Sequence, residues 1–367
     1  MRILFDSRQT QHKTPFGTLR TGECCVLQIR IPTEVGTSGV RLMLEDSEHA
    51  VCAELPFSFA SRGEDGYELW RLEFTRQETG LHFYWFRIDK RGGGSFRLFR
   101  QGRETNMEAG EKWQLSVIPA DFTVPDFAPG AVMYQIFPDR FARSGSCDLT
   151  YKLQPFWVHE SPDELPEYRP DAHGEVRNND FFGGNFAGIR EKLPYLQELG
   201  VGVLYLNPIF MAWSNHRYDT ADYRRPDPML GTEEDFRTLC DEAHARGIRV
   251  ILDGVFSHTG SNSVYFDAKH VFGHGAVSDP NSPYRRWYRF HRYPDDYEAW
   301  WGIRTLPCVE ELDETYLHYI IEDEDSVIAH WLRLGADGFR LDVVDELPDE
   351  FVRRLRRRMR QIDPQSL

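Results

Sequence analysis

The sequence predicts an all-β N-terminal domain followed by an α/β domain. Three observations carry this prediction. Up to about residue 125, short strand-like runs alternate with turns; residues 119–129 are rich in proline and acidic residues; and beyond residue 131, hydrophobic runs alternate with helical patterns. With 367 residues, 41% of them hydrophobic, the chain can bury the cores of two domains.

The N-terminal domain, residues 1–125, has the pattern of a β-sandwich. Its strand-like runs lie at residues 26–31, 40–44, 67–74 and 81–88. The glycine-rich residues 90–94 predict a hairpin turn rather than a phosphate-binding loop, because no helix follows them.

The second domain shows helical signals between its hydrophobic runs. Residues 185–200 carry leucine and isoleucine at helical spacing, with Pro194 expected to kink the helix. Thr232 and Asp235 predict a capping box for a helix that stops at Gly247, and a last helix is expected at 349–362. The long segment 259–325 is irregular and rich in Tyr, Trp, Pro and Asp, and such loops are usually functional.

Two of the hydrophobic runs end in reactive side chains. Arg340 and Asp342 stand two residues apart on a predicted strand, so both point to the same side, and the arginine favours the charged carboxylate. Asp253 and His258 follow an earlier run. The C-terminal ends of parallel strands form the sites of open α/β sheets and of α/β barrels. Taken alone, the Arg340 and Asp342 pair is equally consistent with a structural ion pair.

Four segments occur in the order YQIFPDRF (134–141), NHRYDTADY (215–223), DGVFSH (253–258) and GFRLDVVDE (338–346). Together they resemble the α-amylase family of glycoside hydrolases (family 13), in its neopullulanase, cyclomaltodextrinase and amylopullulanase-like branch. The resemblance covers about residues 131–350. It implies an incomplete (β/α)8 TIM barrel in residues 131–367, holding about the first four βα units, with a loop domain inserted at 259–325 after strand three. It also implies that residues 1–125 are a carbohydrate-binding-module-like β-sandwich. We expect this domain to act as a scaffold rather than to bind glucan or form a dimer interface.

The resemblance also implies roles for single residues. Asp342 matches the catalytic nucleophile, and Arg340 would keep it ionised and oriented. His258 would hydrogen-bond the sugar at the cleavage point, and Asp253 would anchor the end of strand three. Further substrate-binding candidates are Tyr218, stacked on that sugar, His216, Trp300, Trp301 and Glu346. The two tryptophans are equally consistent with plain packing. Asp219 is expected to fix its loop.

Complete family members carry an acid/base Glu after strand five and a further Asp after strand seven. Neither position falls within these 367 residues, so we expect the chain by itself to be an inactive fragment. We also expect the edge of strand four to expose unpaired backbone groups, which favours a homodimer or aggregation. The expected partner is an α-glucan: maltodextrin, cyclodextrin, pullulan or a starch fragment. A glucanotransferase on the same scaffold and a non-catalytic glucan-binding protein are the alternatives.

The charge balance, 58 acidic against 43 basic residues, gives a net charge of −15, which argues against nucleic acid and anionic membranes as partners. The start of the chain has no apolar leader and no long apolar run follows, so the expected location is cytoplasmic. Six cysteines without metal-ligand spacing predict reduced thiols. No metal and no cofactor are expected, because the calcium ligands of relatives are poorly matched, with Ser257 in place of an Asn.

Overall fold

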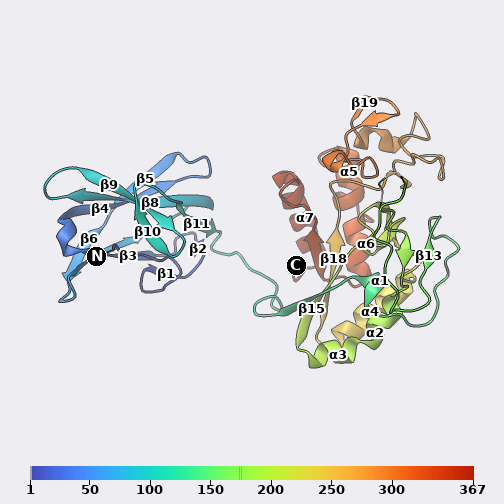
Figure 1. Ribbon diagram of the computed structural model, residues 1–367, viewed down its shortest axis with the longest axis horizontal. Coiled ribbons are helices and arrows are strands. Elements are labelled where there is room, and N and C mark those ends of the chain that lie inside the picture. The colour runs from blue at the N-terminus through green and yellow to red at the C-terminus, as the bar shows by residue number, and fades with distance from the viewer. Residues whose placement is uncertain (1, 173, 175) are drawn as a thin grey trace. The chain divides into compact units, whose positions relative to one another are not determined.

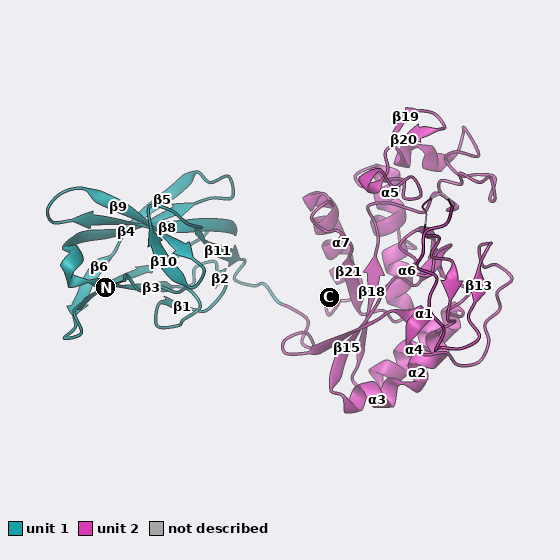
Figure 2. Cartoon of the chain, in the orientation of Figure 1, with its two compact units in different colours: residues 1–123 teal, residues 124–367 magenta. Residues whose placement is uncertain are grey.

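The computed structural model describes residues 2–172, 174 and 176–367. The chain divides into two compact units, residues 1–123 and residues 124–367 (Figure 2). The division falls inside the proline-rich stretch 119–129. In the part of the chain that is described, no helix combines the length and the apolar character that crossing a membrane requires.

Unit 1 consists of two β-sheets (Figure 1). The first sheet has the strand order β1 (Lys13–Thr14), β3 (Cys25–Pro32), β7 (Tyr67–Phe74) and β6 (Ser58–Arg62). The second has the order β10 (Glu104–Met107), β9 (Ser95–Gln101), β8 (Gly80–Lys90), β11 (Trp113–Ile118) and β2 (Leu19–Arg20). To β8 it adds β4 (Thr37–Glu45), which in turn pairs with β5 (Val51–Pro56). A short 3-10 turn, η1 (Thr33–Val35), joins β3 to β4.

The two sheets of unit 1 share one buried cluster. Strand β3 alternates buried and half-buried residues, as a strand with one covered face does. Its Leu27 and Ile29 lie in the same cluster as Leu42, Phe86 and Trp113 of the second sheet. The strand patterns of the sequence thus predicted a real core, and the glycine-rich turn at 90–94 is the hairpin between β8 and β9.

The central sheet of unit 2 is parallel. Its strand order is β12 (Val132–Ile136), β15 (Val201–Leu206), β18 (Arg249–Gly254) and β21 (Gly338–Leu341), so strands that follow one another in this set are neighbours. Helices occupy the connections between them: α1 (Pro138–Phe141), α2 (Phe186–Glu191), α3 (Leu193–Glu198), α4 (Glu233–His244) and α6 (Val327–Leu334), with α7 (Asp349–Ile362) after β21. Three two-stranded sheets complete the described part of the unit: β13 (Trp157–Val158) with β14 (Asp180–Phe181), β16 (Phe210–Ala212) with β17 (Thr220–Pro226), and β19 (Phe290–Arg292) with β20 (Asp296–Tyr297).

Local signals set the helix ends. Thr232 and Asp235 form the reciprocal capping box expected for α4. The helix expected at 185–200 is instead two helices that meet at Lys192, because Pro194 lies in the first turn of α3, where a missing N–H costs nothing. Helix α6 ends at Gly335, whose φ of 115° lies in the left-handed region.

The irregular segment 259–325 packs as part of unit 2 rather than as a separate body. It contains β19, β20, the turns η2 (Pro283–Trp287), η3 (Trp300–Gly302) and η4 (His318–Glu322), and the short helix α5 (Glu314–Leu317). Its Tyr265, Trp287 and Tyr316 lie in the same buried cluster as the core of the parallel sheet. The segment is therefore anchored by aromatic burial.

The outer edge of β21 is partly covered. The N–H of Leu367 donates to the carbonyl oxygen of Asp337 at 2.9 Å, and the N–H of Phe339 donates to the carbonyl oxygen of Leu367 at 2.9 Å. A Cβ on Gly338 would lie 1.9 Å from that oxygen of Leu367, so only glycine allows this approach. We expected the edge of this strand to expose unpaired backbone groups, and at Asp337 and Phe339 that prediction was wrong.

Candidate functional site

Arg340 joins two carboxylates at the C-terminal ends of neighbouring strands. Its Nη1 donates to Oδ1 of Asp342 at 2.7 Å and to Oδ1 of Asp253 at 2.9 Å. The parallel register places Asp253 of β18 beside Arg340 of β21, so their side chains point to the same face. The N–H of Asp342 donates to the carbonyl oxygen of Gly254 at 3.0 Å, which fixes the backbone of Asp342 against the end of β18.

Asp253 is buried, with only 1% of its surface exposed. Besides Arg340, its carboxylate accepts hydrogen bonds from the hydroxyl groups of Tyr205 and Tyr218, the latter at 3.0 Å. Burial raises the pKa of Asp253, and the hydrogen bonds from Tyr205 and Arg340 oppose that rise. Burial lowers the pKa of Arg340, but Asp253 and Asp342 together give it a net rise, so the guanidinium stays charged.

The loop between β16 and β17 carries His216 and Tyr218. The backbone N–H of Tyr218 donates to Nδ1 of His216 at 3.1 Å, so the neutral ring holds its proton on Nε2. Burial lowers the pKa of His216 and raises the pKa of Tyr218 to about 12, so both groups are neutral near pH 7. Asp219 accepts the N–H of Ser214 at 3.2 Å and also its hydroxyl, as expected for a carboxylate that fixes the loop.

His258 lies under Trp300. Its ring is 1% exposed and its centroid lies 5.6 Å from that of Trp300. Nδ1 of His258 lies 3.0 Å from the hydroxyl of Ser257, whereas its buried Nε2 has no hydrogen-bond partner among the described residues. Burial lowers the pKa of His258, and the charge of Asp342 is the largest influence against it, which places the two side chains in one electrostatic environment.

Glu346 holds both tryptophans. Its Oε2 accepts from Nε1 of Trp300 and its Oε1 from Nε1 of Trp301, each at 2.9 Å. The ring of Trp301 is 80% exposed, so the pair is not plain core packing.

Backbone strain clusters at these same residues. Three non-glycine residues with positive φ adjoin or belong to the site: Arg217 at 62°, Trp301 at 50° and Val343 at 40°. Arg217 lies between His216 and Tyr218 in the sequence, and Val343 follows Asp342. Such strain costs on the order of 1–3 kcal/mol per residue and is retained mainly at functional sites.

The contacts connect the nine candidate residues into two groups. Hydrogen bonds and ion pairs link Asp342, Arg340, Asp253, Tyr218 and His216. Ring contacts and hydrogen bonds link His258, Trp300, Trp301 and Glu346. The two groups are linked electrostatically, because the charge of Asp342 acts against the burial that lowers the pKa of His258.

Three supporting residues were missed in the sequence. Tyr205 donates to Asp253, Asn207 donates to the hydroxyl of Tyr218 at 3.1 Å, and Gln135 donates to Asn207 at 2.9 Å. Tyr205 and Gln135 lie inside strands, where they are indistinguishable from core or edge residues. Only Asn207 carried a signal, since it follows β15 at the end of the sheet where the other site residues lie.

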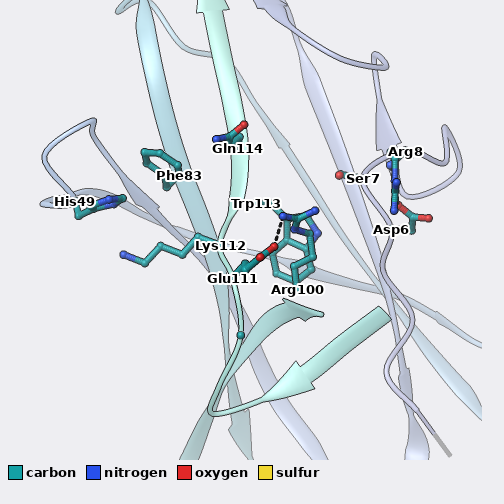
Figure 3. Close-up of a pocket in the computed structure, with 11 residues that line it drawn as sticks. Asp6, Ser7, Arg8, His49, Phe83, Arg100, Glu111, Lys112, Trp113 and Gln114 are labelled. Atoms are coloured by element: carbon teal, nitrogen blue, oxygen red, sulfur yellow. Dashed lines mark hydrogen bonds and ion pairs between the residues drawn. The ribbon is translucent and has the colours of Figure 1, made fainter. Parts of the chain in front are cut away.

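Two other features lie outside this cluster. Within the described residues, Glu314, His318 and Glu322 could together hold a metal ion on the surface, but Arg354 already pairs with both glutamates. In unit 1, a pocket of about 650 Å³ is lined by the segment that holds Asp6 and Arg8 and by Lys112 with the start of β11 (Figure 3). Arg100 pairs with Glu111 and Arg8 with Asp6 inside the pocket, and Lys112 pairs with Glu45 outside its lining, so these charges already have partners.

Comparisons of the sequence with known proteins identify the family to which the chain is similar. The family description "Alpha amylase, catalytic domain" matches residues 135–363. An amylopullulanase of Thermoanaerobacterium saccharolyticum is 33% identical over 398 aligned residues, which cover 98% of this chain and 31% of that protein. Neopullulanase 2 of Thermoactinomyces vulgaris is 36% identical over 67% of this chain and 39% of its own length. The chain thus spans less than half the length of these curated relatives.

A solved structure gives the same result. The type III pullulan hydrolase from Thermococcus kodakarensis superimposes with a TM-score of 0.57 at 26% identity, covering 99% of this chain and 60% of that one. The similarity therefore extends over both units.

Proposed function

Because the chain belongs to the α-amylase family, whose catalytic-domain description covers residues 135–363, we propose that unit 2 carries the nucleophile side of a retaining α-glucan hydrolase site. In this proposal the four parallel strands are the first four βα units of a (β/α)8 barrel. The observation that supports it best is the pairing of Asp342 with Arg340 and Asp253 at adjoining strand ends.

Asp342 has one oxygen free for attack. Arg340 donates to Oδ1, and Oδ2 accepts no hydrogen bond from the residues that the structure describes. Oδ2 attacks the anomeric carbon, the glycosidic C–O bond breaks, and the leaving oxygen takes a proton from a general acid. Water then cleaves the glycosyl ester, which returns the carboxylate and releases the sugar. Arg340 and Asp253 act by holding the carboxylate in place.

The neighbours of Asp342 would bind the sugar. His216 offers an Nε2–H donor that can meet a sugar hydroxyl. Nε2 of His258 has no partner among the described residues, but it is buried beside Trp300, so a sugar hydroxyl can reach it only if that ring moves. Tyr218 offers a ring fixed by its hydroxyl bonds to Asp253 and Asn207. Flat apolar rings with neutral donors suit a neutral polyol, and the substrate class we propose is maltodextrin, cyclodextrin, pullulan or a starch fragment.

A general acid is the missing part of this arrangement. Besides Asp342, the carboxylates among the nine candidate residues are Asp253, which is bound by Arg340, and Glu346, whose two oxygens accept indole N–H groups. Neither offers an O–H to a leaving oxygen. General acid help is worth roughly 10²- to 10⁴-fold, so we propose that the 367-residue chain alone hydrolyses maltodextrin poorly or not at all.

A substrate whose leaving group needs no protonation tests the nucleophile separately from the general acid. Fluoride leaves an α-maltosyl fluoride without protonation, so the chain should release fluoride from it while leaving maltodextrin almost untouched. Asp342→Asn should reduce that release at least a hundredfold, and the exposed control Asp345→Asn should not. Fluoride release unchanged in Asp342→Asn would refute the nucleophile assignment. Maltosyl transfer to added maltose, seen by chromatography, would favour the glucanotransferase alternative, and sugar binding with no fluoride release would favour the non-catalytic one.

A further inference from the structure

Unit 2 contains a cavity of about 770 Å³ that has none of the nine candidate residues in its wall. Three stretches form it: residues 150–154, the hairpin of β16 and β17, and the segment from Asn262 to Tyr284 together with Tyr319. Its volume falls within the roughly 300–1,000 Å³ of pockets that bind small organic ligands.

Aromatic rings line this cavity. They belong to Tyr151, Phe272, Tyr284 and Tyr319. The ring of the buried Tyr265 packs against those of Tyr284 and Tyr319, with centroids 5.3 Å and 5.6 Å apart, so both rings are held in place. Tyr151 also lines the cavity but is 71% exposed, so its large ring is open to solvent.

The cations of the wall each have a carboxylate partner, although two of these partners, Asp227 and Asp325, lie outside the wall. Asp222 lies 3.6 Å from Arg225, Arg224 pairs with Asp325 at 3.1 Å, and the buried Lys152 pairs with Asp227 at 2.7 Å. Three cations and three carboxylates take part in these pairs, so the cations of the wall are already neutralised. Such a wall disfavours a phosphate or carboxylate ligand and suits a neutral one.

The floor of the cavity is a small hydrophobic cluster of its own. Leu153 and Met211 are buried in it, and Phe272 packs against them. Met211 belongs to β16, and the loop that follows this strand carries His216 and Tyr218. The cavity thus lies at the base of the hairpin that carries part of the candidate site.

We propose that this cavity binds a stretch of neutral α-glucan chain at a second site, separate from Asp342. A pyranose ring presents a flat face of C–H groups and a rim of hydroxyls, which match fixed aromatic rings and paired polar groups. The choice of an α-glucan over another neutral sugar rests on the proposed function, whereas the ring faces and the charge balance are properties of the cavity.

The test is titration calorimetry of the Asp342→Asn chain with maltopentaose, which avoids turnover. We expect two binding events. Adding Tyr151→Ala and Phe272→Ala should weaken one of them about tenfold or more, the loss of roughly 1.4 kcal/mol of contact. Tyr195→Ala removes a tyrosine that is 53% exposed on α3, outside the cavity, and should change neither event. Hydrogen exchange in residues 150–154 should slow when maltopentaose is added.

One binding event, or two events that Tyr151→Ala with Phe272→Ala leaves unchanged, would overturn the second site. So would unaltered exchange at residues 150–154. Fluoride release by the unsubstituted chain reports on Asp342 and not on the cavity. Release together with a single binding event would therefore refute this inference and leave the proposed function standing.

Discussion

At the scale of single residues, the site depends on one guanidinium shared by two carboxylates. Arg340 lies 42% exposed, whereas the carboxylate of Asp253 is fully buried. Burying a charge is costly unless it is paired and hydrogen-bonded, and Asp253 is satisfied by Arg340 and two tyrosine hydroxyls. Asp253 thus serves as the fixed anchor of Arg340, which in turn orients the less buried Asp342.

Glu311 provides a test of how burial acts on a carboxyl group in this unit. Burial raises its pKa from 4.5 to about 7, and the charge of Glu310 adds to the rise. The folded chain therefore binds this proton more tightly than the unfolded chain does. Its contribution to stability is full below pH 4.5 and is lost as the pH rises through about 7.

We expect Glu311→Gln to remove this pH dependence. Above pH 7 the variant should be more stable than the unsubstituted chain by about 1–2 kcal/mol, allowing for solvent screening of a partly exposed group. At pH 4.5 the two should be equal. Urea unfolding at both pH values measures the difference, with the exposed Glu324→Gln as the control. Equal stabilities above pH 7 would show that the burial of Glu311 carries no such cost.

At the scale of elements, the site exists because strands β15, β18 and β21 end at the same edge of one parallel sheet. Register matters here more than any single contact. A shift of one residue between β18 and β21 would turn Arg340 away from Asp253. The elements around the strands are therefore expected to tolerate little displacement.

Gly188 shows one such restraint. A Cβ there would lie 2.1 Å from the carbonyl oxygen of Ala142, so α2 can approach the chain after α1 only with glycine. Alanine is normally favoured over glycine inside a helix by about 0.5–1 kcal/mol. The clash should outweigh this, and Gly188→Ala should cost about 1–3 kcal/mol.

Thermal unfolding measures this cost against a matched substitution. Gly202→Ala on β15 places its Cβ 3.4 Å from the Cβ of Ala131, which is an ordinary contact. Its melting temperature should stay near that of the unsubstituted chain, while that of Gly188→Ala should fall by several degrees. If both variants melted alike, the close approach of α2 would not limit stability.

Local sequence was sufficient to predict many elements. The capping box of Thr232, the end of α4 just before Gly247 and the alternation of β3 each depend on neighbours a few residues apart, so the pattern alone defines them. The motif resemblance also indicated which polar residues would gather. The support from Tyr205 and Gln135 could not be predicted in this way, because it depends on the register between strands far apart in the sequence.

At the scale of the whole molecule, the chain holds two units with separate hydrophobic clusters, one from both sheets of unit 1 and one around the parallel sheet of unit 2. The change from alternating strands to βα units predicted where one unit gives way to the other. The backbone pairing of Leu367 with the edge of β21 was not predictable, because the three C-terminal residues, Gln365 to Leu367, carry no strand pattern of their own.

The central claim is that Asp342 is the group that attacks the sugar. The most direct measurement is mass spectrometry of the chain after incubation with 5-fluoro-α-glucosyl fluoride. The ring fluorine slows both chemical steps and the fluoride leaving group restores the first, so a glycosyl ester should accumulate. We expect one added glycosyl group on the peptide that contains Asp342, and none in Asp342→Asn. A label on Asp253 or Glu346, or a labelled Asp342→Asn chain, would contradict the account.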